Sequence, residues 1–170
     1  MSEQQLVDCS TPQGNEGCNG GLMDQAFTYL ETNALDTEAS YPYLAKDGTC
    51  HSTTGSAVTK VTGFHDVTPN SPAALLAAIQ LQPVSVAVDA NIVWQLYSGG
   101  IVKANCGANL DHGVLLVGYG TATDGTDYWI VKNSWGPNWG EQGYIRLKRD
   151  AVEGKPGLCG IQSDASYPLL

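Results

Sequence analysis

Three histidines are the side chains in this sequence best suited to acid–base chemistry near neutral pH. His51 and His65 stand in polar, loop-like stretches, where an ordinary surface or half-buried histidine is the better interpretation. His112 differs because it opens an apolar run, residues 112–117. Taken alone, it is best explained as a histidine at a strand end with one satisfied hydrogen bond.

A second strand end changes that interpretation. Asn133 follows an apolar run that ends at Lys132, and Trp135 and Trp139 come shortly after it. An Asn side-chain oxygen can orient an imidazole, and neighbouring tryptophans would exclude water from that hydrogen bond and strengthen it. An oriented histidine indicates a nucleophile to activate. The alternative is an Asn-Ser turn flanked by core tryptophans.

Cysteine spacing is informative about redox chemistry. No two cysteines form a Cys-x-x-Cys pair, so neither zinc nor thioredoxin-type chemistry is expected, and no metal or other cofactor is predicted. The wide spacings suit disulfides in an oxidising compartment. The count is odd, so one thiol is free or has its partner elsewhere. The five are Cys9, Cys18, Cys50, Cys106 and Cys159.

The sequence that must form the elements positioning these residues divides into two parts of different composition. Residues 1 to about 64 are polar and Gly-rich, whereas the remainder, to residue 170, has longer apolar runs. Ser2 with Gln5 predicts a capping box at the start of a short helix. The glycines of residues 17–21 predict a tight loop. A helix should follow it, with apolar residues at helical spacing: Leu22, Ala26, Phe27 and Leu30.

The second part contains one clear helix and several strands. Ser71 and Pro72 predict an N-cap and a first helical residue, with the helix continuing to Leu81. Closely spaced strands without intervening helices indicate an antiparallel sheet and an α+β fold. The expected strands are residues 84–88, 114–119, 128–131 and 144–148.

The charge balance excludes some partners. The chain of 170 residues has 8 basic and 17 acidic side chains and a formal net charge of −9. Nucleic acid and anionic membrane surfaces would repel such a protein. No apolar run is long enough for a transmembrane helix, and no signal peptide is expected at Met1.

Several motifs, in order along the chain, resemble the papain family of cysteine proteases, nearest to its cathepsin L-like members. The resemblance implies a two-lobe α+β fold: a helical lobe, here residues 1–64, and a β-barrel-like antiparallel sheet lobe, residues 65–170. Together they would form one catalytic domain with the active cleft between them. The motifs, each numbered at its first residue, are Ser2-Glu-Gln-Gln-Leu, Gly17-Cys-Asn-Gly-Gly, Tyr41-Pro-Tyr, Gln82-Pro-Val, Asp111-His-Gly, Val117-Gly-Tyr-Gly, Lys132-Asn-Ser-Trp-Gly, Trp139-Gly-Glu and Cys159-Gly.

The resemblance also implies roles for particular residues. His112 would be the general base, Asn133 would hold its tautomer, and Trp135 with Trp139 would shield their bond. The backbones of Gly20 and Gly21 would pair with substrate. The remaining substrate-binding residues, chiefly of the S2 specificity pocket, would be Leu22, Met23, Ala87, Asp111, Gly113 and Asp164. The alternatives are core packing for Leu22 and Met23 and a solvent-facing Asp164.

One departure from the family pattern affects the whole interpretation. The nucleophile motif, Cys-Gly-Ser/Ala-Cys-Trp/Tyr, is absent from these residues. Counting back from His112 by the family spacing of about 130–150 residues places that cysteine before Met1. The chain is therefore expected to be a cysteine endopeptidase domain truncated at its N-terminus and inactive alone. The alternatives are a non-catalytic pseudo-protease, an incomplete fragment, or a heavy chain whose nucleophile lies on a separate chain.

The remaining implications concern pairing and partners. The resemblance implies disulfides Cys9–Cys50 and Cys106–Cys159 and leaves Cys18 unpaired. Peptide and protein substrates are expected, with cystatin-like or propeptide inhibitors, no nucleic acid, no membrane and a monomeric state. A lysosomal, vacuolar or extracellular location is implied by the family and by the cysteines.

Overall fold

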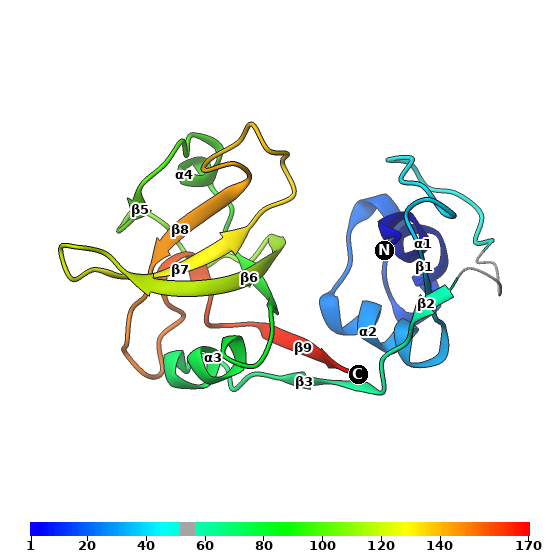
Figure 1. Cartoon of the computed structure of the whole chain (residues 1–170), viewed down its shortest axis with the longest axis horizontal. Coiled ribbons are helices and arrows are strands. Elements are labelled where there is room, and N and C mark those ends of the chain that lie inside the picture. Colours follow the sequence, from blue (N-terminus) through cyan, green and yellow to red (C-terminus); the bar gives the residue numbers. More distant parts are fainter. Residues whose placement is uncertain (52–56) are drawn as a thin grey trace. The chain divides into compact units, whose positions relative to one another are not determined.

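The computed structural model of this protein describes residues 1–51 and 57–170. The chain folds as two compact units, which we call unit 1 and unit 2 (Figure 1). Unit 1 is Met1–His65 with Pro168–Leu170, and unit 2 is Asp66–Tyr167.

Unit 1 is built from short helices around a small core. Its elements are α1 Glu3–Cys9, η1 Thr11–Gln13, η2 Gly17–Asn19, α2 Met23–Thr32, β1 Leu35–Asp36 and β2 Ala57–Thr59, with β3 Gly63–Asp66 at its end. The buried apolar residues that pack together are Cys9, Tyr29, Leu30, Leu35 and Val61.

Only half of the capping box predicted for α1 forms. The Ser2 hydroxyl accepts a hydrogen bond from the Gln5 amide at 3.0 Å, as an N-cap does. The Gln5 side chain does not return to Ser2. Its Nε2 donates to the Tyr29 hydroxyl and the Ala34 carbonyl, while its Oε1 accepts from the Asp36 amide. Gln5 is fully buried, and these long-range partners satisfy it better than the helix end would.

The helix predicted after the glycine loop is α2, but Leu22 lies outside it. Leu22 is the extended N-cap residue and is 57% exposed. Leu30 is buried, as its helical spacing predicts, and Tyr29 beside it is buried too. The apolar spacing therefore located the helix but placed its first residue one position too early.

Unit 2 is dominated by a sheet. Its elements are α3 Pro72–Ile79, β4 Val84–Val88, α4 Ile92–Gln95, β5 Ile101–Val102, β6 His112–Thr121, β7 Asp127–Lys132, β8 Tyr144–Lys148, η3 Leu158–Gly160 and β9 Ala165–Leu169. Together with β3, these six strands form a seven-stranded sheet in the order β3-β9-β4-β6-β7-β8-β5. All four predicted strands are present, two with the predicted bounds and two longer.

The sheet differs in two ways from the expected antiparallel, barrel-like one. Its described strands form an open sheet, and the two-residue β5 lies parallel to β8, whereas β4, β6, β7 and β8 pair antiparallel.

Pro72 begins α3 as predicted, but the helix ends at Ile79, and Leu81 is 75% exposed. The mixed α+β class is confirmed.

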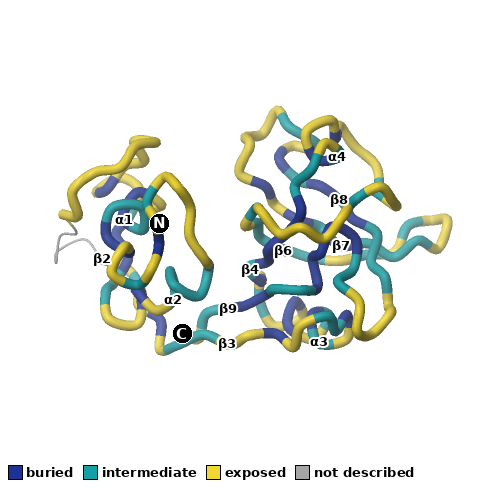
Figure 2. The backbone as a smooth tube through the Cα atoms, turned by 180° about the vertical axis from the view of Figure 1, so that it is seen from behind, coloured by how far each residue is buried: buried dark blue, intermediate teal, exposed yellow. Residues whose placement is uncertain are grey.

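The core of unit 2 is formed by strand residues together with residues of α3, α4 and η3. Four of the five residues of β4 are buried, all except Ser85, and Figure 2 shows this strand among the buried parts of unit 2. Alternate residues of β7 and β8 are fully buried, including Trp129 and Ile145. Trp94 of α4 is also fully buried in this core. A rigid sheet therefore carries the strand ends on which the candidate site is built.

Candidate functional site

Two neighbouring strands bring His112 and Asn133 together. β6 begins at His112, β7 ends at Lys132, and the strands are antiparallel with Leu115 opposite Lys132. The start of one strand and the end of the other therefore meet at the same edge of the sheet. There, His112 Nε2 lies 2.8 Å from Asn133 Oδ1.

This hydrogen bond selects the tautomer of His112. Asn133 Oδ1 also accepts from the Ser134 amide at 2.8 Å, so that atom is an acceptor and His112 Nε2 is the donor. In the neutral ring, Nδ1 then carries the lone pair and can accept a proton. Asn133 is 7% exposed, so the bond is largely shielded from water, which strengthens it.

Tryptophan rings surround the pair. The Trp135 ring stacks on the His112 ring with centroids 5.4 Å apart, and it is 40% exposed. Trp139 packs edge-on against Trp135 at 5.2 Å and stacks on Trp94 at 5.9 Å. Trp135 therefore covers one face of His112, and Trp139 supports it from behind.

Trp94 also contacts His112, and no motif in the sequence indicates it. Its ring meets the edge of His112 at 6.3 Å, and its Nε1 lies 3.4 Å from Cys159 Sγ. Its backbone carbonyl accepts from Trp139 Nε1 at 2.9 Å. The available signal was Asn91, which caps α4 through a bond to the Val93 amide. That signal locates a helix but does not show which ring faces the histidine.

Four of the predicted substrate-binding residues lie in unit 2. Ala87 of β4 is the register partner of Gly113 of β6, and the Ala87 amide donates to the Asp164 carbonyl at 2.9 Å. Asp111, beside His112, accepts from the Ala90 amide through its carboxylate at 2.8 Å. The end of the β4–β6 strand pair that carries His112 therefore also carries Ala87 and Gly113.

The other predicted substrate-binding residues lie in unit 1. Gly20 has a φ of 115°, a conformation that favours glycine, and Gly21 follows it in an exposed segment. Leu22 is 57% exposed, so the core-packing alternative does not hold for it. Met23 is half-buried at the first position of α2.

The cysteines pair as the resemblance implies. Cys9 is bonded to Cys50 in unit 1, and Cys106 to Cys159 in unit 2. Cys18 is a free, exposed thiol. Partial loss of hydration and the negative charge of Asp47 raise the pKa of the Cys18 thiol, which lowers its thiolate fraction.

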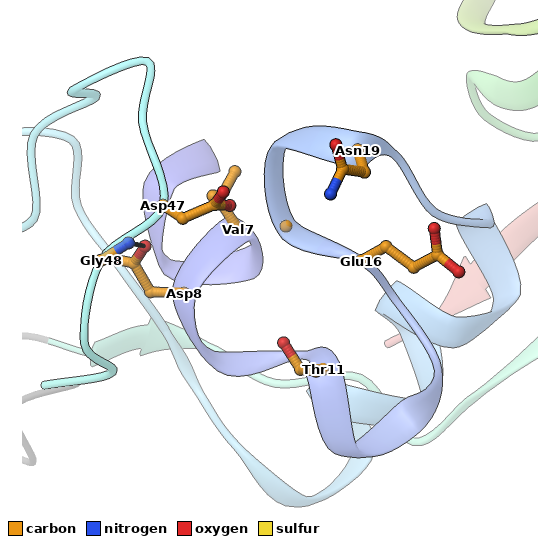
Figure 3. Close-up of a pocket in the computed structure, with 8 residues that line it drawn as sticks. Val7, Asp8, Thr11, Glu16, Asn19, Asp47 and Gly48 are labelled. Atoms are coloured by element: carbon orange, nitrogen blue, oxygen red, sulfur yellow. Dashed lines mark hydrogen bonds between the residues drawn. The ribbon is translucent and has the colours of Figure 1, made fainter.

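A polar pocket beside Cys18 contains none of the predicted site residues. It lies in unit 1 and has a volume of about 410 Å³ (Figure 3). Asp8 and Asp47 already accept bonds from the amides of Gly48 and Cys18. The pocket is lined by Val7, Asp8, Thr11, Glu16, Gly17, Asn19, Asp47 and Gly48.

Two further findings bear on ligand and membrane chemistry. Among residues 1–51 and 57–170, no group of three His, Cys, Asp or Glu side chains is placed to hold a metal ion. In the same described stretches, no helix has both the length and the apolar character needed to cross a bilayer.

Comparisons with known proteins extend over nearly the whole chain. Residues 1–169 match the model of the papain family of cysteine proteases. Vignain of Ricinus communis is 54% identical over 172 residues, which cover 99% of this chain and 47% of vignain. The thiol protease SEN102 of Hemerocallis is 53% identical, with the same two shares. The chain thus spans about half the length of the curated relatives that it matches.

Solved structures agree. The bromelain protease of Ananas comosus, in complex with the inhibitor E64, is 42% identical with a TM-score of 0.91, covering all of this chain and 78% of that one. Digestive procathepsin L 3 of Tenebrio molitor is 45% identical with a TM-score of 0.92, covering 99% and 55% respectively. With the sheet edge that joins His112 to Asn133, these matches show that the chain belongs to the papain family of cysteine proteases.

Proposed function

We propose that this chain supplies the base and part of the substrate-binding surface of a cysteine endopeptidase. The single observation that carries the proposal is the 2.8 Å bond from His112 Nε2 to Asn133 Oδ1, which leaves Nδ1 as the basic nitrogen. The nucleophile is a cysteine outside these 170 residues, because no segment of them matches the family's nucleophile motif.

The reaction is acyl transfer. His112 Nδ1 takes the thiol proton, and the resulting thiolate attacks the substrate carbonyl. The imidazolium then protonates the leaving amine as the peptide C–N bond breaks. In the second half, His112 removes a proton from water, the hydroxide attacks the thioester, and the thiol is regenerated. Asn133 accepts from Nε2 throughout, and Trp135 with Trp139 keeps water from that bond.

Substrate specificity is proposed to depend on an S2 pocket. We assign the apolar walls of this pocket to Ala87 and Gly113 and its floor to Asp164, all of unit 2. Leu or Phe at P2 is accepted by burial, and Arg through its guanidinium on the Asp164 carboxylate. Peptides and proteins are the substrates, and propeptide or cystatin-like inhibitors compete for the same surface. The two disulfides favour an oxidising compartment, vacuolar, lysosomal or extracellular.

The test compares two proteins. The first is the 170-residue chain. The second, called the extended chain, adds the upstream segment encoded by its own transcript or, failing that, the corresponding segment of vignain. We expect the extended chain to cleave peptidyl substrates and to be blocked by E64, and the 170-residue chain to do neither. His112→Ala in the extended chain should lower kcat by at least about 100-fold.

The outcomes separate the alternatives. Activity of the extended chain that survives His112→Ala would refute the proposal. E64-sensitive turnover by the pure 170-residue chain would refute an external nucleophile. An inactive extended chain would favour the non-catalytic alternative, whose basis is the absence of the nucleophile motif.

The S2 assignment has its own test. Kcat/KM is compared for Arg and Leu at P2, with Asp164→Ala against Asp66→Ala as a matched surface control. Loss of the carboxylate partner should lower the Arg-to-Leu ratio by about five- to a hundredfold. A ratio that does not change would remove Asp164 from the S2 floor.

A further inference from the structure

Asn15 is a buried polar side chain in unit 1 that the peptidase chemistry above does not use. It is 8% exposed. Its amide is bonded at both ends: Nδ2 donates to Ser10 Oγ at 2.8 Å, and Oδ1 accepts from the Leu22 amide at 2.9 Å. The loss of either bond would leave a buried polar atom unpaired, so the amide is held in one orientation.

The segment that Asn15 contacts is the glycine edge, which we define as Gly20 and Gly21. The Glu16 amide donates to the Gly20 carbonyl at 2.8 Å, which ties one end of the edge. The Leu22 amide ties the other end: its shorter bond is to Asn15 Oδ1 at 2.9 Å, and a longer one reaches Gln25 Oε1 at 3.3 Å. Between these ties, within the described part of the chain, the amide and carbonyl of Gly21 make no hydrogen bond. They are therefore open to pair with an extended peptide.

The two positions of the glycine edge need glycine for different reasons. At Gly20 an added Cβ would meet no atom within 4 Å, but the φ of +115° strains any other residue. At Gly21 a Cβ would overlap Oδ1 and Cγ of Asn15. The Asn15 side chain thus packs directly against the backbone of Gly21 and supports it.

Ser10 connects this support to α1. Its hydroxyl donates to the Leu6 carbonyl at 2.6 Å and accepts from Asn15, and Ser10 is fully buried. A chain of hydrogen bonds therefore runs from Leu6 through Ser10 and Asn15 to the Leu22 amide. Such a chain transmits the rigidity of the helix end to an otherwise irregular segment.

From these contacts we propose that Asn15 is the positioning residue of the glycine edge. The inference rests on the proposed function, in which this edge pairs with the backbone of the bound peptide. Asn15 touches no substrate and acts through the Leu22 amide and the Gly21 backbone. Backbone pairing at this edge is made equally in the ground state and the transition state, so its loss raises KM and leaves kcat unchanged.

The test uses the extended chain with three substitutions. Asn15→Ala removes both bonds, whereas Asn15→Asp keeps an oxygen for the Leu22 amide. Asn33→Ala is the matched control, because Asn33 donates to the Tyr29 carbonyl at 3.0 Å at the other end of α2. We expect Asn15→Ala to raise KM about tenfold with kcat within about twofold, and Asn15→Asp to restore KM to within about threefold. Asn33→Ala should leave both constants unchanged.

Amide hydrogen exchange gives a readout that needs no turnover. The Leu22 amide should exchange at least about tenfold faster in Asn15→Ala than in the wild type, and it should stay protected in Asn15→Asp. A fall in kcat with KM unchanged, or unchanged protection of the Leu22 amide in Asn15→Ala, would overturn the proposal. An inactive wild-type extended chain would refute the proposed function and with it this role. If the wild-type extended chain turns over normally and Asn15→Ala leaves KM unaltered, the positioning role of Asn15 is refuted and the proposed function stands.

Discussion

At the residue scale, the candidate site depends on which nitrogen of His112 is committed to a partner. The Ser134 amide fixes Asn133 Oδ1 as an acceptor, and that oxygen in turn fixes His112 Nε2 as a donor. The stacked Trp135 ring limits rotation of the imidazole. Asn133 and Trp135 thus hold the ring, and Nδ1 is its basic nitrogen.

The first prediction concerns Asn133. Asn133→Ala in the extended chain should lower kcat about ten- to a hundredfold, because an unheld imidazole spends less time in the productive orientation. Asn133→Asp keeps an acceptor for Nε2 and should recover most of the loss. Steady-state kinetics measure both variants. If Asn133→Ala and Asn133→Asp lower kcat equally, the acceptor oxygen of residue 133 has no role in catalysis.

The second prediction concerns Cys18 in the 170-residue chain. Asp47 lies beside this thiol, accepts a bond from the Cys18 amide at 2.7 Å, and helps to raise the thiol pKa. Asp47→Asn removes the charge, lowers that pKa and increases the thiolate fraction at pH 8. Alkylation should become about two- to fivefold faster.

A charge-matched control separates local from general effects on Cys18. Glu31→Gln removes the same charge from α2 and should leave the alkylation rate unchanged. If both substitutions accelerate alkylation equally, net charge rather than the neighbouring carboxylate controls the thiol.

At the element scale, helix ends and hairpins are held by polar contacts that extend beyond the element itself. Ser2 caps α1 and also donates to the Tyr41 carbonyl at 2.7 Å. Glu141 binds Arg146 through both carboxylate oxygens, at 2.6 and 2.8 Å, and accepts from the Gly100 amide at 2.9 Å. The bonds from Ser2 to Tyr41 and from Gly100 to Glu141 each fasten an element to a segment far from it in the chain.

The third prediction compares two helix caps. Ser2→Ala loses two bonds at a fully buried site and should lower the free energy of unfolding by about 1–2 kcal/mol. Ser71→Ala loses one bond, to the Ala74 amide at 3.2 Å, and should cost less. Urea denaturation followed by circular dichroism gives both values. An equal cost would mean that the Ser2–Tyr41 bond contributes nothing.

The fourth prediction is a pH dependence. The hydrogen bonds and charge of Arg146 lower the pKa of Glu141 from its ordinary value of 4.5. A lowered native pKa stabilises the fold above pH 4.5, and that stabilisation is lost as the pH falls through the native value. Glu141→Gln should therefore lower Tm by about 2–4 °C at pH 7 and by less at pH 3.

An exposed pair provides the comparison. Lys103 and Asp124 are 51% and 55% exposed, so Asp124→Asn should change Tm little despite the lowered pKa of Asp124. A Tm difference between Glu141→Gln and wild type that is the same at pH 3 and pH 7 would contradict the linkage.

At the scale of the whole molecule, each unit contains its own disulfide. The Cys9–Cys50 bridge joins residues 41 apart, and the Cys106–Cys159 bridge joins residues 53 apart. The entropy of closing a loop grows only with the logarithm of its length, so the two bridges should contribute similarly.

The fifth prediction follows from this similarity. Replacing Cys106 and Cys159 by Ser should lower the free energy of unfolding by about 2–4 kcal/mol, and replacing Cys9 and Cys50 should have a comparable effect. Denaturant titration under non-reducing conditions measures both, with the oxidised wild type as the reference. Unchanged midpoints in either double variant would show that its bridge adds no stability.

Local sequence patterns alone predict much of the secondary structure. Pro72 after Ser71 marked the start of α3, and alternating side chains marked β8, because capping and strand pleating depend on residues close in sequence. The papain resemblance supplied the residues of the candidate site. His112 and Asn133 were linked because both stand at strand ends.

Only the tertiary structure determined how distant segments meet. Trp94 faces His112 from a four-residue helix, Gln5 turns from its own helix end toward Asp36, and Asn15 supports Gly21. Nothing in the local sequence of Trp94, Gln5 or Asn15 specifies these partners. A buried polar or aromatic side chain takes the partners that packing brings to it, and packing depends on the whole chain.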